Sequence, residues 1–425
     1  MLKFYIALFW LAIGLPLRAQ PLDRHQVEAL ALARQPRLQA AQREVEATQK
    51  LIDQAHMSPN PVLSLGTEVP ALRIVSRVQM SLSQPFEMGG KRAARVQLAE
   101  AVNQESAARQ REAERQVLLE VRQAYAELLA AERKVSLESQ AASTAERQWK
   151  LAQGRFKLGD IPKVEVMQLQ ADFSRAQAIA TQTEAEAQIR RASLAMWLAL
   201  PTQEVQVRGQ LGSDAGLPPL DELLSQALSG RPDLQVLSLG QQRRQSETRL
   251  EQAKGVSDLT LQTGLAYDRT YISPQNQTSG LTGIGQPVLS VTAGLSIPLP
   301  FHDDNSGNIE ASQLRAQGAE SEREALERQV RSQVESAYLT VLANQKTRQT
   351  LAQQTLPLTS QTLTILEDAY RVRARSLSEV LNSRRAYLEA ARAELEAARQ
   401  EELALIRLEA ASAHDLPRND KDGTP

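Results

Sequence analysis

Stretches in which apolar and polar residues alternate stand out in this chain. In one of them, Leu63 and Leu65 alternate with Ser64 and Gly66. Because successive side chains of a strand point to opposite faces, this pattern predicts a strand with one apolar face and one small or polar face. Four such strands are predicted, at residues 61–69, 74–85, 258–267 and 288–298.

The predicted strands are long enough for a transmembrane β-barrel, since a tilted strand needs about 9–11 residues to cross a bilayer. Leu261 and Val291 are then expected to face lipid, and Gln262 and Thr292 to face the lumen. A half-buried sheet of a soluble domain shows the same alternation and is the alternative. Open edges cannot exist in lipid and small barrels need about eight strands, so the barrel interpretation requires a dimer, trimer or tetramer.

Two very long helical segments follow the predicted strand pairs, beginning at Lys91 and Asn308. At about 1.5 Å per residue, a helix of about 65 residues is about 100 Å long. Arginines and glutamates off the apolar positions predict solvated faces and no site. Apolar residues at 3–4 spacing predict narrow coiled-coil seams, formed by Leu118, Val121, Tyr125, Leu128 and Val135 in the first hairpin and by Leu381, Leu388, Ala391, Leu395, Ala398 and Leu405 in the second.

Each long helix is expected to reverse at a short turn, Leu158–Pro162 in the first half and Arg373–Ser376 in the second. In the first turn, Gly159 is expected to end one helix in a backbone conformation closed to β-branched residues, and Asp160 to cap the next helix. In the second turn, Ser376 is followed three residues later by a glutamate, which predicts a capping box. Both turns are therefore expected to be the tips of helical hairpins.

The two halves of the chain carry the same succession of elements. Leu259 follows Leu63 by 196 residues (259 − 63 = 196), and Val334 follows Val121 by 213 (334 − 121 = 213). A longer connection between the second pair of strands accounts for the change. A register kept this well predicts two copies of one unit: a helix, two strands and a long helical hairpin.

The predicted organisation is a tandem repeat behind a signal peptide. Lys3, the apolar run after it and Ala19 before a cut predict a signal peptide over residues 1–19, and the apolar run is short for a membrane anchor. The parts predicted after it are a first repeat at 20–200 with its hairpin at 91–200, a linker at 201–219, a second repeat at 220–412 with its hairpin at 308–412, and a flexible tail at 413–425.

Composition argues against several classes of function. A formal net charge of −1 gives no reason to expect a nucleic-acid partner, and the absence of cysteine excludes disulfides and thiolate sites. The four histidines are scattered, and His302 with Asp303 is better explained as a polar turn than as a metal site. No nucleotide-binding glycine loop or nucleophile–base set is evident. We therefore expect no enzymatic activity, no cofactor and no resident metal.

Two strand-to-helix stretches are distinctive, residues 82–92 (LSQPFEMGGKR) and 295–300 (LSIPLP). Together with the repeated strands and hairpins, they resemble the outer-membrane efflux protein family, the TolC-like channel-tunnels, and most of all its heavy-metal-efflux, CzcC-like branch. The resemblance implies a mainly α chain with a transmembrane β-barrel: a homotrimer with a 12-stranded barrel in outer-membrane lipid and a coiled-coil tunnel in the periplasm. It also implies two partners, a periplasmic adaptor protein at the hairpin tips and an inner-membrane resistance-nodulation-division pump.

The tip pattern of that family is an aromatic residue, a glycine three residues later, and then an acidic residue before two apolar ones. Gly159 and Glu165 fit it in the first turn, and Tyr370 and Glu379 in the second, where Arg373 stands in place of the usual glycine and puts the shape of that turn in question. By resemblance, the residues at the adaptor-docking and entrance tips are Gly159, Asp160, Glu165, Arg375 and Glu379. For Glu379, a plain helix cap is the alternative role.

The sequence thus predicts a passive outer-membrane duct of a tripartite efflux system, with heavy-metal cations as the favoured substrate. A duct for drugs or type I secreted polypeptides is one alternative. A soluble periplasmic coiled-coil scaffold is another.

Overall fold

The computed structural model describes residues 21–68, 74–212, 216–271 and 287–416 of the 425-residue chain. The predicted signal peptide, the first inter-strand connection, most of the second connection and residues 417–425 of the predicted tail lie outside the described residues. The described chain divides into two compact units. The helical unit comprises the described residues within 21–40, 111–232 and 327–416, and the sheet unit those within 41–110 and 233–326. Each unit contains segments of both predicted repeats.

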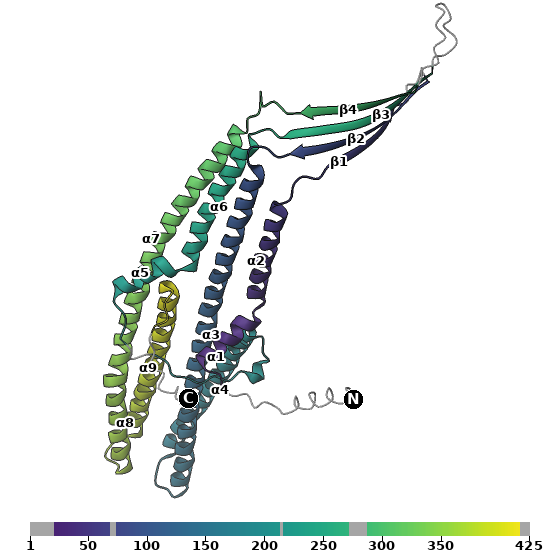
Figure 1. Ribbon diagram of the computed structural model, residues 1–425. Coiled ribbons are helices and arrows are strands. Elements are labelled where there is room, and N and C mark those ends of the chain that lie inside the picture. The colour runs from purple at the N-terminus through teal and green to yellow at the C-terminus, as the bar shows by residue number, and fades with distance from the viewer. Residues whose placement is uncertain (1–20, 69–73, 213–215, 272–286, 417–425) are drawn as a thin grey trace, which may run out of the picture. The chain divides into compact units, whose positions relative to one another are not determined.

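The sheet unit contains one antiparallel sheet in the order β1-β2-β3-β4 (Figure 1). The third strand continues beyond its predicted end at residue 267, because Tyr271 pairs with Ile74 at the start of the second strand. The strands are β1 (Val62–Glu68), β2 (Ile74–Phe86), β3 (Leu259–Tyr271) and β4 (Val288–Ser296).

The register of the sheet separates an apolar face from a small, polar face, as the alternation predicts. One cross-strand row of the apolar face joins Leu65, Met80, Leu265 and Val291. Leu65 and Val291 are 74 % and 76 % exposed, whereas Ala266 on the other face is 4 % exposed. Near Ala266 the polar face is therefore more closely packed than the apolar face, which is what local curvature of the sheet toward the polar face produces.

The helix predicted before each strand pair is broken in two. The breaks fall at Gln35 and Arg231, whose backbone angles are nearly the same (φ −67°, ψ 120° and φ −67°, ψ 124°). Each of these residues precedes a proline, whose ring disfavours the helical conformation at the residue before it. The prediction of single helices was therefore wrong, and the helices are α1 (Arg24–Arg34), α2 (Pro36–Ala55), α5 (Leu220–Gly230) and α6 (Pro232–Lys254).

The two long hairpins are present, and the first of them rises through one uninterrupted helix of 67 residues. In the second, a π-helical turn ends at Thr355, two residues before Pro357. Proline has no N–H to donate to the hydrogen bonds of the helix. The closing helices both end at an alanine in the left-handed conformation, Ala199 (φ 50°) and Ala413 (φ 51°). The elements are α3 (Lys91–Lys157), α4 (Lys163–Leu198), η1 (Thr202–Glu204), α7 (Ser306–Thr350), η2 (Leu351–Thr355), α8 (Leu356–Arg371) and α9 (Leu377–Ser412).

The core of the helical unit follows the predicted seams only in part. Val121 and Leu128 are fully buried as expected, and Val117 occupies the buried position expected for Leu118. The prediction that glutamates form solvated faces was wrong for Glu138, Glu401 and Glu409, which are 1 %, 0 % and 2 % exposed. Each has arginine partners, which is what allows a carboxylate to be buried. None of the helices in the described segments is apolar over a length that would cross a bilayer.

Candidate functional site at the hairpin tips

The first tip follows the C-terminus of α3. Gly159 has a φ of 76°, in the left-handed region that β-branched residues avoid, as predicted. Its N–H donates to the carbonyl of Phe156, and the N–H of Asp160 donates to the carbonyl of Arg155. The prediction that Asp160 caps the next helix was wrong: Pro162 is the N-cap of α4 and makes no side-chain cap bond.

The second tip, between α8 and α9, repeats this backbone geometry without a glycine. Arg373 has a φ of 62°, its N–H donates to the carbonyl of Tyr370, and the N–H of Ala374 donates to the carbonyl of Ala369. The hydrogen-bond pattern is that of the first tip, 214 residues on (373 − 159 = 214). A non-glycine residue in this conformation costs about 1–2 kcal/mol. The second turn therefore keeps the shape of the first although Arg373 replaces the usual glycine, and the left-handed conformation of Arg373 strains the backbone.

Asp160 links the two tips. Its carboxylate accepts from Arg155 Nε at 2.7 Å and forms an ion pair with Arg373 across the gap between the turns. The hydrogen bond from Arg155, followed by the charges of Arg155 and Arg373, lowers the pKa of Asp160. This engagement is the physical reason why Asp160 is not available to cap α4.

Glu165 makes a second link, by accepting a hydrogen bond from the hydroxyl of Tyr370 at 2.8 Å. Burial and this hydrogen bond raise the pKa of Tyr370 to about 12, so the phenol remains a donor at every physiological pH. The guanidinium of Arg155 lies 6.0 Å from the centre of the Tyr370 ring. Beneath these polar contacts, the two hairpins share an apolar cluster of the buried residues Ala152, Leu169, Leu377 and Leu381.

Arg375 and Glu379 do not take part in these links. Glu379 completes the predicted capping box with Ser376, whose N–H donates to it at 2.9 Å. Hydrogen bonds from Ser376 lower the pKa of Glu379. Arg375, in the turn before α9, pairs with Glu379 of the first turn of α9 at 3.2 Å. In the single chain, the helix-cap interpretation of Glu379 therefore holds, and both contacts stay local to the start of α9.

Above the tips, arginines of α9 continue to bind acceptors on α3, a set that sequence reasoning missed. Arg392 holds Glu138 through two bonds of 2.7 and 2.8 Å, and Arg384 donates to Gln148. Arg399 pairs with Glu127 at 2.6 Å. A signal for the buried carboxylate was present, because residues 138, 145 and 152 fall on a seven-residue spacing that continues the seam of α3.

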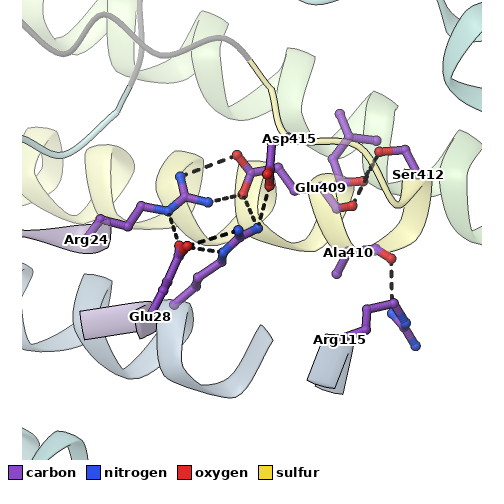
Figure 2. A network of polar contacts seen from close by, with 9 residues as sticks. Arg24, Glu28, Arg115, Glu409, Ala410, Ser412 and Asp415 are labelled. Carbon is purple, nitrogen blue, oxygen red and sulfur yellow. Dashed lines mark hydrogen bonds and ion pairs between the residues drawn. The ribbon is translucent and has the colours of Figure 1, made fainter. Parts of the chain in front are cut away.

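A second buried network connects the first and last helices of the helical unit (Figure 2). Glu409 binds Arg24 at 2.5 Å and Arg122 at 3.3 Å. Glu28 pairs with both arginines, at 2.8 and 2.7 Å, and Asp415 pairs with Arg122 at 2.9 Å. Burial acts to lower the pKa of Arg24, but the charges and hydrogen bonds of Glu409 and Glu28 together outweigh burial and raise that pKa. The cluster therefore fixes α1 and α9 to α3.

Comparison with known proteins decides the family. The family described as "Outer membrane efflux protein" matches residues 28–200 and 223–414. This chain belongs to the outer membrane efflux protein family. It is a protein of the outer membrane.

One relative is the cobalt-zinc-cadmium resistance protein CzcC of Cupriavidus metallidurans, which is 27 % identical over 379 residues, 87 % of this chain and 85 % of the relative. Solved outer-membrane channels share the fold at 16 % identity. The structure of CusC has a TM-score of 0.72 over 92 % of this chain and 91 % of that one. VceC of Vibrio cholerae has a TM-score of 0.71 over 92 % and 96 %. The predicted mainly helical fold with four strands per chain and the predicted outer-membrane location are thus confirmed.

Removing the Asp160 carboxylate should loosen the tips of this outer-membrane efflux protein. Asp160→Ala frees both Arg155 and Arg373, so we expect a higher single-channel conductance in planar bilayers. Because the pKa of Asp160 lies below the usual aspartate value of about 4, its carboxylate stays charged and bound to the two arginines at neutral pH. These ion pairs are lost only when the pH falls below that usual value and through the lowered pKa.

The matched control is Asp368→Ala, because Asp368 pairs only with Arg371 of its own helix, at 3.0 Å, among its described ion pairs. It should leave conductance unchanged. Equal conductance of Asp160→Ala and the wild-type channel would contradict a linking role for Asp160.

Proposed function

We propose that this protein is the outer-membrane channel of a tripartite efflux system and passively conducts heavy-metal cations. In this proposal three copies close a 12-stranded barrel, from four strands each. An inner-membrane resistance-nodulation-division pump and a periplasmic adaptor protein deliver the substrate. The protein itself catalyses no reaction.

The observation that carries the proposal is the sheet. Within the described chain, β1 and β4 each pair on one side only, and the apolar face that the sheet presents is exposed. Unpaired edges cannot stay in a bilayer, so further strands must come from other copies of the chain. A soluble scaffold would have no use for a broad exposed face of leucine and valine.

The choice of substrate rests on the similarity to a cobalt-zinc-cadmium resistance protein over most of both chains. The adaptor is proposed to dock at the tips, with Gly159, Asp160, Glu165, Arg375 and Glu379 around the docking surface and entrance. Support comes from the two turns, which have the same backbone geometry and are held together by Asp160 and Glu165.

The test is complementation in a host strain that lacks this protein but keeps its pump and adaptor. Wild-type protein should restore growth on cobalt, zinc or cadmium salts, and light scattering in detergent should give three protein masses per particle. Restored resistance to organic toxicants alone would replace metals by drugs as the substrate. A monomer would refute the proposed barrel.

Gly159→Val tests docking in the same strain. Valine cannot adopt the φ of 76° without strain, although no neighbouring atom blocks its side chain. We expect normal trimer but lost metal resistance. Gly154→Val is the matched control, because Gly154 lies within α3, also has open space and has no positive φ. Full resistance in the Gly159→Val strain would remove these turns from the docking surface.

A further inference from the structure

One cross-strand row of the sheet collects the charged residues of the polar face. Glu68 of β1 is the pairing partner of Arg77 of β2, which in turn is the partner of Asp268 of β3. Arg77 Nε lies 3.4 Å from Asp268 Oδ1. The order across three neighbouring strands is therefore acidic, basic, acidic.

The rest of this face carries no charge in the strand segments that the structure describes. By the register, the residues that share it are small or neutral. They are Val62, Ser64, Gly66, Val75, Gln79, Ser81, Ser83, Pro85, Thr260, Gln262, Gly264, Ala266, Thr270, Val288, Ser290, Thr292, Gly294 and Ser296. Charge on this face is thus confined to a single level of the sheet.

Two glycine positions on this face are closely packed. A Cβ atom on Gly264 would lie 2.8 Å from the hydroxyl of Thr292, and one on Gly66 would lie 3.2 Å from the amide nitrogen of Gln79. Small residues in the rows next to the charged one let the strands curve toward the polar face, and in the proposed trimer that curvature places the polar face inside the closed barrel. The side chains of Arg77 and Asp268 remain 41 % and 33 % exposed, so both charged groups are in contact with the solvent on that side of the sheet.

We propose that Glu68, Arg77 and Asp268 form a charged ring that makes the channel selective for cations over anions. The proposal rests on the proposed trimeric duct. Each chain contributes −1 to the ring (−1 + 1 − 1 = −1), and three chains contribute −3. Rings of carboxylates inside a pore concentrate cations and exclude anions.

Arg77 limits the strength of this ring. Without it the three chains would present six uncompensated carboxylates (3 × 2 = 6), a level of charge suited to holding divalent cations. Conduction requires binding that is favourable enough for entry and weak enough for exit. The carboxylates of Glu68 and Asp268 therefore attract the metal cation, and the positive charge of Arg77 weakens its binding enough for the cation to leave.

The test is the reversal potential of purified channels in planar bilayers under a KCl gradient. Arg77→Gln should raise the cation-to-anion permeability ratio by roughly twofold or more, and Asp268→Asn should lower it by a similar factor. Arg77→Lys keeps the charge and is the matched control, expected to match the wild-type channel. At 1 M salt the differences should shrink, because the screening length falls to about 3 Å.

A second measurement uses CdCl₂ added to the bath. Cadmium should reduce the potassium current at lower concentration in Arg77→Gln than in the wild-type channel, because the cation stays longer at the ring. Conducting trimers in which Arg77→Gln and Asp268→Asn leave selectivity unchanged would overturn the charged ring but not the duct. A wild-type protein that forms no trimer and no channel would overturn both.

Discussion

Replacing Glu409 with alanine should lower the free energy of unfolding by about 3 kcal/mol, at the low end of the 3–5 kcal/mol expected when one partner of a buried ion pair is removed. Its side chain is 1 % exposed and is shared by Arg24 and Arg122. Alanine would leave both guanidiniums without this carboxylate in a site poor in water. The low end applies because Glu28 still pairs with both arginines (Figure 2).

The matched control is Asp415→Ala, in the same cluster. Asp415 pairs with Arg122 at 2.9 Å, but its side chain is 78 % exposed, so its loss should cost no more than about 1 kcal/mol. Thermal unfolding of the detergent-solubilised protein, followed by helical circular dichroism, measures both variants. Equal shifts of the melting temperature would show that burial does not set the importance of Glu409.

Val291→Arg should sharply reduce the amount of assembled protein in the outer membrane, whereas Thr292→Arg should not. The two residues are neighbours in the middle of β4 but belong to opposite faces, and Val291 is 76 % exposed on the apolar one. An arginine facing lipid at the bilayer midplane costs about 2–4 kcal/mol per chain. An arginine facing the lumen meets water.

The measurement is the quantity of heat-resistant oligomer in outer-membrane fractions, resolved by gel electrophoresis. Loss with Val291→Arg alone supports lipid contact for the apolar face. The opposite result would mean that the faces are exchanged, and equal amounts would mean that neither face meets lipid.

The strands and long helices could be predicted from the sequence because both are set by local periodicity. The alternation around Leu261 and Val291 determines which residues share a face, and strand pairing preserves it. The absence of proline from α3 permits its full length. The missed breaks at Gln35 and Arg231 were also within reach, since each stands before a proline, but the apolar periodicity on either side concealed them.

The polar contacts of the tips could not be predicted in the same way. Asp160 fits a helix cap when only its neighbours in sequence are considered, and of its two arginine partners the one that links the tips, Arg373, lies 213 residues away. The same holds for Glu138 and Arg392, which meet only once α3 and α9 are aligned against each other. Local patterns give the apolar seam, whereas the pairing of charges across it depends on a register that only tertiary packing sets.

The two unpaired edges of the sheet bear on how this protein reaches its membrane. In the described part of a single copy, the apolar face of the sheet is exposed and the outer edges of β1 and β4 pair with no strand, so the copy can neither enter lipid alone nor remain long in water without risk of aggregation. In the proposed assembly, insertion is therefore a collective event. Its rate should rise steeply with the local concentration of newly exported chains, because three copies must meet before any of them can enter lipid.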